Sequence, residues 1–327
     1  MPKPTNNCEI PKKRKRIPCC PRQKMIYAMI VTMLSAIIKT MRPRQWPKNV
    51  FVLAAVIFDR QLSMSNFDPL LRSLAGFALF CLLSSAIYYI NDLADIEADR
   101  NHPKKRYRPI ASGKLPIPMA IGIAVALLLI SFIGALLLSF NFFLISVAYF
   151  LANLGYSLWL KHVPLVDVLI LASGFVLRVA AGVMIIQVER FSPWLYVVTT
   201  LFALYIGFGK RRAEIALLEH DAQNHRRVLD GYNIPLLDQL ITIVSSSTIL
   251  AYSLYTFSAT NLPANHTMML TIPFVLYGVF RYLYLIQIKN EGGAPEELLL
   301  TDRPLQATVL LYGLSVFLII YVIPRYF

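Results

Sequence analysis

Long apolar segments alternate with short polar ones along most of the chain. An apolar α-helix needs roughly 17–25 residues to cross the ~30 Å hydrocarbon core of a bilayer. The apolar segment 27–41 is short for a crossing, so it predicts an interfacial helix. Longer apolar segments predict nine membrane-spanning helices, at 49–67, 70–91, 116–139, 141–160, 164–186, 193–209, 236–257, 268–287 and 305–325. The pattern therefore indicates an all-α, polytopic membrane protein.

The polar segments divide the chain into two parts. Residues 1–25 combine several prolines with a block of lysines and arginines, a composition that predicts a disordered basic tail. Residues 26–327 contain no further linker-like segment, so we predict a single transmembrane helical domain. We expect function in its longer connections, because loops at helix ends carry most binding residues. These connections are 92–115, 210–235 and 288–304.

Composition and charge agree with this topology. Hydrophobic residues make up 57% of the 327 positions and the mean hydropathy is +0.56, whereas soluble domains are about 45–50% apolar. If the N-terminus is cytoplasmic, most of the 32 lysines and arginines fall in cytoplasmic segments, as the positive-inside rule requires. The net charge of +14 then reflects topology. Nucleic-acid binding is not supported, because it predicts one basic patch and not a distribution by loop side.

An acidic motif follows directly on the second predicted span. If the helix continues through the motif, Asp92, Asp95 and Asp99 fall within about 60° of one another on one face, and Glu97 points away. Carboxylates that converge in this way repel unless they share a cation, and oxygen-only ligands suit Mg²⁺, which usually also binds a substrate phosphate. The motif predicts a magnesium-diphosphate site at the membrane surface. The alternative is a solvated helix end.

Cationic residues follow the acidic motif in sequence. Lys105, Arg106 and Arg108 lie in the next connection, where they would face a phosphate held by the metal. Lys48, before the first span, adds a further cation. Topology alone also predicts basic residues in these segments. Their adjacency to the carboxylates favours the phosphate interpretation.

A second polar group surrounds the start of the fifth predicted span. Tyr156 and Lys161 lie at the end of the fourth span, and Asp167 begins the fifth. Arg178 falls within about 20° of Asp167 on one helix face. An intramembrane arginine costs several kcal/mol unless it faces a polar cavity or a counter-charge. Arg178 is therefore a functional candidate, and the alternative is a structural pair with a carboxylate on a neighbouring helix.

A third cationic group ends the sixth predicted span. Lys210 and Arg211, with Glu214 at helical spacing, predict contacts to a second phosphate. Motifs for other chemistries are missing from the sequence, which has no H-E-x-x-H, no G-x-S-x-G, no Walker loop and no G-x-G-x-x-G. Zinc proteases, serine hydrolases and P-loop or dinucleotide-binding enzymes are therefore not supported.

Three motifs together resemble the UbiA superfamily of intramembrane prenyltransferases, over about residues 40–325. They are R-P-x-Q-W-x-K-N at 42–49, N-D-x-x-D-x-x-x-D at 91–99 and Y-S-x-x-L-K at 156–161. The resemblance implies nine transmembrane helices around a cytoplasm-facing cavity that binds a diphosphate through Mg²⁺. Aromatic-ring prenyltransferases of the superfamily carry a second motif, D-x-x-x-D. This chain departs from that pattern, because the partner carboxylate of Asp167 is missing.

This departure and the cationic motifs look like the subgroup of decaprenyl-phosphate phosphoribosyltransferases. The resemblance implies transfer of a 5-phosphoribosyl group from 5-phosphoribosyl 1-diphosphate to a polyprenyl phosphate, with release of diphosphate, in a bacterial inner membrane. The site would face the cytoplasm and serve cell wall biosynthesis. The resemblance assigns the metal and the diphosphate to Asn91, Asp92, Asp95 and Asp99. Our candidates for the remaining phosphates are Lys161, Lys210 and Arg211, and we expect Asp167 and Arg178 to shape the polar floor of the cavity.

Two other functions stay open on the sequence. One is a prenyltransferase of the same fold, which would move a polyprenyl group from its diphosphate to an aromatic acceptor. The other is a transporter or lipid-binding membrane protein, in which Arg178 and the carboxylates would line an ion path. The identity of the donor and the formation of a covalent product distinguish the three.

Overall fold

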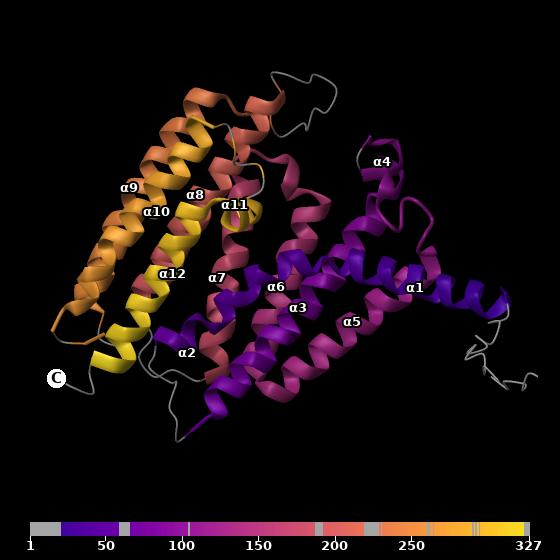
Figure 1. Ribbon diagram of the computed structural model, residues 1–327, viewed down its shortest axis with the longest axis horizontal. Helices are drawn as coiled ribbons and strands as arrows, with labels where there is room; N and C mark the ends of the chain where they lie inside the picture. Colours follow the sequence, from indigo (N-terminus) through magenta and orange to yellow (C-terminus); the bar gives the residue numbers. More distant parts are fainter. Residues whose placement is uncertain are drawn as a thin grey trace, which may run out of the picture.

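Helices form all the regular structure of the described residues in the computed structural model (Figure 1). These residues are 21–58, 66–103, 105–186, 192–218, 229, 231–259, 262–263, 265–289, 291, 293 and 295–323. The α-helices are α1 (Pro21–Met41), α2 (Ala54–Phe58), α3 (Asp68–Ala94), α4 (Ile96–Asn101), α5 (Ile117–Leu138), α6 (Phe140–Leu158), α7 (Val166–Ile186), α8 (Pro193–Leu218), α9 (Ile234–Ser258), α10 (Ile272–Gln287), α11 (Pro295–Thr301) and α12 (Arg303–Phe317). Short 3-10 turns are η1 (Pro43–Leu53), η2 (Lys105–Tyr107), η3 (Leu160–His162) and η5 (Thr267–Thr271), and a π-helical turn, η6 (Leu318–Val322), ends the last span.

Seven described helices are long and apolar enough to cross a membrane. They correspond to seven of the nine predicted spans, so the chain is an all-helical, polytopic membrane protein. The predicted span 49–67 differs, because Pro43 and Pro47 lie in the 3-10 segment η1 and only α2 follows before residues outside the described part. The predicted span 193–209 lies within α8, which continues into a charged segment up to Leu218.

The interfacial helix is present and longer than predicted. Helix α1 contains the whole predicted segment 27–41 and begins at Pro21, so it includes the last residues of the segment predicted to be disordered. Residues 1–20 lie outside the described residues. Figure 1 shows α1 extending sideways from the other helices.

Helix α7 lies between two groups of helices (Figure 1). On one side, α3, α5, α6 and η1 share an apolar core with the second half of α7, which contributes Ala181 and Ile185. On the other side, α8, α9 and α10 share a core that includes Val168 from the start of α7. A side chain at Gly182 would collide with the carbonyl oxygen of Val52. The glycine therefore lets η1 lie directly on α7, as small residues do at membrane helix contacts.

Asp302 fixes the start of α12 to α10. It accepts hydrogen bonds from Arg281 at 2.7 and 3.2 Å and from the backbone N–H of Leu305 at 2.9 Å. The hydrogen bond from Arg281 holds the pKa of Asp302 below its ordinary value of 3.8. An aspartate whose pKa is lower in the folded protein than in the unfolded chain stabilises the fold at pH values above its unfolded pKa. This contribution is lost as the pH falls through the pKa of the folded state.

We therefore expect Asp302→Asn to lower the unfolding temperature of the detergent-solubilised protein at neutral pH. Asparagine still caps a helix N-terminus, so the substitution chiefly removes the charge. The difference from wild type should shrink as the pH falls below about 4, as measured by thermal unfolding over a pH series. A difference that stays constant across the series would contradict an ionic origin.

Candidate active site

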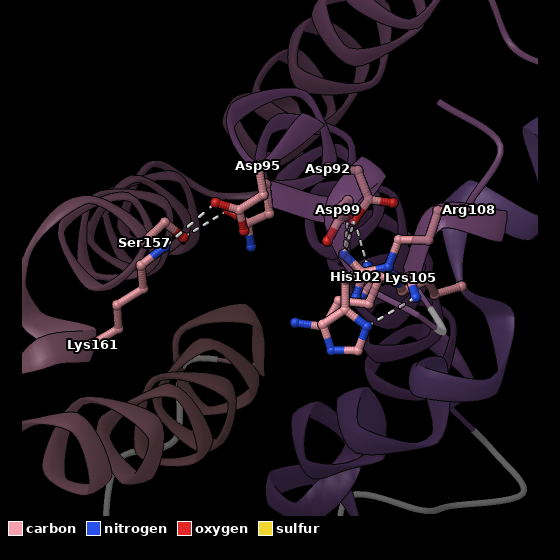
Figure 2. A network of polar contacts seen from close by, with 10 residues as sticks. Asp92, Asp95, Asp99, His102, Lys105, Arg108, Ser157 and Lys161 are labelled. Carbon is pink, nitrogen blue, oxygen red and sulfur yellow. Dashed lines mark hydrogen bonds and ion pairs between the residues drawn. The ribbon is translucent and has the colours of Figure 1, made fainter. Parts of the chain in front are cut away.

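The acidic motif lies at a break between two helices. Helix α3 ends at Ala94, Asp95 adopts φ −97° and ψ 14°, and α4 begins at Ile96. The prediction of one continuous helix through the motif is therefore wrong, and the turn at Asp95 separates the three carboxylates into two directions. Figure 2 shows Asp92 and Asp99 on one side of the turn and Asp95 on the other. Glu97 is exposed, as predicted.

Two arginines neutralise the buried carboxylates of the motif. Asp92 and Asp99 are each only 3% exposed. Arg108 bridges them, with Nη1 at 3.2 Å from Asp92 Oδ1 and 2.6 Å from Asp99 Oδ2 (Figure 2). Arg42 Nη2 lies 2.5 Å from the same Asp92 oxygen. Buried carboxylates require such partners, and both arginines come from connections that the fold brings back onto α3 and α4.

The end of α6 and the turn after it approach the motif from the opposite side. Lys161 Nζ, in η3, lies 3.6 Å from Asp95 Oδ1, and the Ser157 hydroxyl donates a hydrogen bond of 2.6 Å to Asn91 Oδ1. Figure 2 shows Ser157 and Lys161 pointing toward Asp95 and the end of α3. The structure thus joins the motif at 91–99 to the motif at 156–161, which are far apart in sequence.

The donor set of the motif fits magnesium by its chemistry. Three carboxylates and one amide oxygen lie along the α3–α4 turn, and hard divalent cations prefer oxygen ligands. The carboxylates are not clustered for a metal in the described residues, where no three His, Cys, Asp or Glu side chains form a group that could hold one. Positive side chains lie against each carboxylate instead, and Asp95 is the most accessible, with 43% of its side chain exposed.

A second polar cluster is buried between α6, α7 and α8. Asp167 is fully buried and Arg211 is 1% exposed, and Arg211 Nε lies 2.7 Å from Asp167 Oδ2. Arg211 also lies 2.5 Å from Glu214 and donates a 3.5 Å hydrogen bond to the Tyr156 hydroxyl. The predicted residues Tyr156, Asp167 and Arg211 are therefore brought together.

Tyr232 completes this cluster from the segment before α9. Its hydroxyl donates to Asp167 Oδ1 at 2.7 Å and accepts from the backbone N–H of Leu165 at 2.6 Å. Burial and the hydrogen bond to Asp167 raise the pKa of Tyr232 above its ordinary range. The hydroxyl therefore stays protonated and holds the α6–α7 turn, in which Leu165 has a positive φ of 67°.

Arg178 occupies a separate, purely neutral environment. It is 7% exposed and donates to Asn49 Oδ1 at 2.8 Å, to the Gly174 carbonyl at 2.8 Å and to the Tyr149 hydroxyl at 2.7 Å. The Asn49 side-chain amide also donates a hydrogen bond of 3.2 Å to the Ser84 hydroxyl on α3. The alternative of a carboxylate partner is not observed in the described residues. Arg178 instead ties η1, α3, α6 and α7 together.

This arrangement predicts coupling between Arg178 and Asn49. Lysine has one ammonium group and cannot reach three acceptors in the geometry of a guanidinium, so Arg178→Lys should cost about 1–3 kcal/mol of stability. Asn49→Ala should cost a similar amount, and the double variant should lose less than the sum, because the two side chains share one interaction. Unfolding of the three variants in detergent measures this, and additive losses would contradict the shared contact.

The remaining predicted residues lie on η1, η2 and α8. Lys105 and Arg106 are exposed in η2, where Arg106 contacts the Tyr107 hydroxyl at 2.7 Å. Lys48 is partly buried in η1. Lys210 is partly buried on α8 beside Arg211 and forms no ion pair with the part of the chain that the structure describes.

Several contacting residues were not among the candidates predicted from sequence. They contribute a cation, amides or hydroxyls to the clusters above, and they are Arg42, Asn49, Tyr149, Ser157 and Tyr232. Arg42, Asn49 and Ser157 lie within the quoted motifs at 42–49 and 156–161, so the motifs held a signal for them. Tyr149 and Tyr232 lie in ordinary apolar or loop segments and carry no such signal.

Comparison with known proteins identifies the family. The family model described as "UbiA prenyltransferase family" matches residues 49–300. A decaprenyl-phosphate phosphoribosyltransferase from Corynebacterium glutamicum is 35% identical over 292 residues, which are 88% of this chain and 88% of that protein. The enzyme of the same name from Mycobacterium tuberculosis is 33% identical over 280 residues, covering 85% of this chain and 92% of that protein.

A solved structure with the same fold is also known. A UbiA homolog from Archaeoglobus fulgidus bound to GPP and Mg²⁺ superposes with a TM-score of 0.66 at 20% identity, over 88% of this chain and 100% of that chain. At this identity the similarity shows the fold alone.

Proposed function

The chain belongs to the UbiA prenyltransferase family, and from this premise we propose that it is a polyprenyl-phosphate phosphoribosyltransferase. It moves the 5-phosphoribosyl group of 5-phosphoribosyl 1-diphosphate onto a polyprenyl phosphate such as decaprenyl phosphate and releases diphosphate. The observation that carries the proposal is the 33–35% identity to decaprenyl-phosphate phosphoribosyltransferases over at least 85% of the chain. The gathering of carboxylates and cations at the α3–α4 turn supports it.

We assign the diphosphate of the donor to the acidic motif. Asp92, Asp95 and Asp99, with the Asn91 amide oxygen, would hold Mg²⁺. Bound Mg²⁺ in the Archaeoglobus homolog supports a metal in this fold. Bound there, the metal would neutralise the negative charge that develops on the leaving diphosphate as the C1–O bond breaks. Arg108, which lies between Asp92 and Asp99, is placed to donate to phosphate oxygens in the fork geometry that arginine offers.

We assign the other phosphates to two lysines. Lys161 lies beside Asp95, and Lys210 lies on α8 next to Arg211, so we assign them to the ribose 5-phosphate and the lipid phosphate. Lys48, Lys105 and Arg106 supply further positive charge. Arg211 and Asp167 are buried against each other, and we assign them to holding Tyr156 and the end of α6 in place.

The acceptor needs little activation. An oxygen of the polyprenyl phosphate is already anionic, so it can attack ribose C1 without a dedicated general base. The bond from C1 to the diphosphate oxygen breaks as the bond to the lipid phosphate oxygen forms. Because the acceptor enters from the bilayer and the donor from water, the reaction requires a site at the membrane surface, where the acidic motif ends a membrane-spanning helix.

The topology of the chain follows from the same proposal. Nine crossings, with the N-terminus and the loops after α3 and α8 in the cytoplasm, put the acidic motif and Lys210 on the side where a water-soluble donor is made. We further propose a cytoplasm-facing cavity between these loops, in a bacterial inner membrane. The distribution of lysine and arginine supports this orientation.

The test is a donor comparison on purified protein in proteoliposomes. With Mg²⁺, labelled 5-phosphoribosyl 1-diphosphate and polyprenyl phosphate, a lipid-linked phosphoribose should form and diphosphate should be released in equal amount. With a polyprenyl diphosphate and 4-hydroxybenzoate, no prenylated aromatic product should form. The opposite pattern would establish the rival prenyltransferase, and solute flux without a covalent product would establish a transporter.

A further inference from the structure

Arg42 is held in an unusual backbone conformation beside the acidic motif. It joins α1 to η1 with φ 53° and ψ 60°, in the left-handed region. This region is costly for a residue with a Cβ, and the following Pro43 restricts Arg42 further. Strained residues of this kind persist only where surrounding contacts hold them, and they concentrate at functional sites.

Two residues of α3 hold the Arg42 guanidinium in different ways. Nη2 lies 2.5 Å from Asp92 Oδ1, and the guanidinium carbon lies 4.6 Å from the centre of the Tyr88 ring. The contact with Asp92 is an ion pair that a metal could replace. The contact with the ring is a cation–π interaction, which would keep the guanidinium in place if Asp92 changed partner. The Arg42 side chain is 30% exposed, whereas that of Asp92 is 3% exposed.

Each of the three aspartates of the acidic motif has a cationic partner among the described residues. Asp92, Asp95 and Asp99 each contact a cation, supplied by Arg42, Arg108 or Lys161. A divalent cation that entered alone would leave these cations without partners and repelled by the new charge. A divalent cation that enters with a diphosphate avoids this cost. The carboxylates can then bind the metal, and the guanidinium groups can bind the phosphate oxygens.

Resting on the proposed function, we propose that Arg42 is a donor-binding residue that exchanges partners. It neutralises Asp92 in the unliganded protein and binds the diphosphate group of the donor once a divalent cation takes its place on Asp92. The exchange makes binding of the metal and the diphosphate mutually dependent, so that each raises the affinity for the other by the same factor. The site then takes up little metal without donor and holds the complete metal–diphosphate unit tightly.

The backbone at Arg42 offers an informative pair of variants. Glycine adopts a positive φ without strain, so Arg42→Gly removes the guanidinium and should leave the fold intact. Arg42→Lys keeps a positive charge but loses the planar fork. Arg44→Ala is the matched control, because Arg44 is exposed in the same segment and its loss changes the net charge by the same amount.

Two binding measurements on the purified, detergent-solubilised chain test the exchange without turnover. The first is Mn²⁺ binding in the absence of other ligands, followed by electron paramagnetic resonance. The second is calorimetric binding of inorganic diphosphate at a fixed Mg²⁺ concentration. In Arg42→Gly, Mn²⁺ should bind about 3–10-fold more tightly because Asp92 has lost a competing cation, and diphosphate should bind about 10-fold or more weakly because a charge-assisted contact is gone.

Opposite shifts in the two affinities support the exchange, with an intermediate effect in Arg42→Lys and changes within about twofold in Arg44→Ala. Weakening of both ligands in Arg42→Gly would mean that Arg42 only organises the site, and unchanged affinities would mean that it does not touch the ligand. Either result overturns the inference. Neither binding measurement depends on ribosyl transfer. Failure of the proposed function would therefore appear separately, because the wild-type protein would make no lipid-linked product.

Discussion

Replacing Asp92 with asparagine should reduce transfer of the phosphoribosyl group by on the order of 10³-fold. Asparagine has nearly the same shape, but it replaces the carboxylate, whose oxygens we assign to the metal that holds the leaving diphosphate, with a neutral amide. Asp92 is 3% exposed and contacts both Arg42 and Arg108, so the change also removes the negative charge that these two guanidinium groups share. Initial rates of lipid-linked product formation at saturating donor and acceptor measure the effect.

Glu97→Gln is the matched control for this experiment. Glu97 lies in the same motif but is exposed on α4, so its loss changes the charge of the segment without touching the carboxylates that we assign to the site. Its rate should stay within about twofold of wild type. If Asp92→Asn retained more than a tenth of the wild-type rate, or if both variants lost activity equally, the assignment of Asp92 would be wrong.

The second large effect is expected on stability, at the buried cluster around Arg211. Arg211 contacts both Asp167 and Glu214, so Arg211→Met leaves two carboxylates without their cation. Removing one member of a buried ion pair costs about 3–5 kcal/mol. Asp167→Asn should cost less, because Arg211 keeps Glu214 and Tyr232 can still donate to the amide oxygen. Equilibrium unfolding in detergent should therefore rank Arg211→Met as the more damaging change.

Two further variants sharpen this expectation. Arg212→Met removes the neighbouring arginine, whose partner Asp238 has 34% of its side chain exposed, and a more exposed pair should contribute less. The double variant Asp167→Asn with Arg211→Met should recover part of the loss, because one buried negative charge is removed along with the cation. Equal losses in Arg211→Met and Arg212→Met, or full additivity in the double variant, would contradict a buried ionic cluster.

The lengths of the apolar segments were sufficient to predict most of the fold. Seven predicted spans match helices that could cross a membrane, since length and hydrophobicity are local properties of the sequence. The segment after residue 42 was harder, because Pro47 and polar residues such as Asn49 allow a 3-10 conformation only when a neighbouring helix supplies partners. Arg178 of α7 donates to Asn49, and Gly182 leaves room for the Val52 backbone. Nothing within 42–53 indicates either contact.

The residues of the site were easier to predict than their geometry. The motifs at 91–99 and 156–161 were both recognised, but helical periodicity placed Asp95 beside Asp92 and Asp99, whereas the turn at Asp95 directs it to Lys161. The pairing of Asp167 with Arg211 was also out of reach, because the two residues lie 44 positions apart and a single sequence shows no contact between them. Local patterns predict which groups are present, and only packing decides which of them meet.

The most direct test of the central claim is to locate the bound metal. We would determine the structure of the protein with Mn²⁺ and 5-phosphoribosyl 1-diphosphate, and use the anomalous signal of manganese to place the ion. The ion should lie on oxygens of Asp92, Asp95 and Asp99, with the donor diphosphate against it and Arg108 turned to the phosphate. Manganese and donor bound away from this turn, in a protein that still makes the lipid-linked product, would contradict the account.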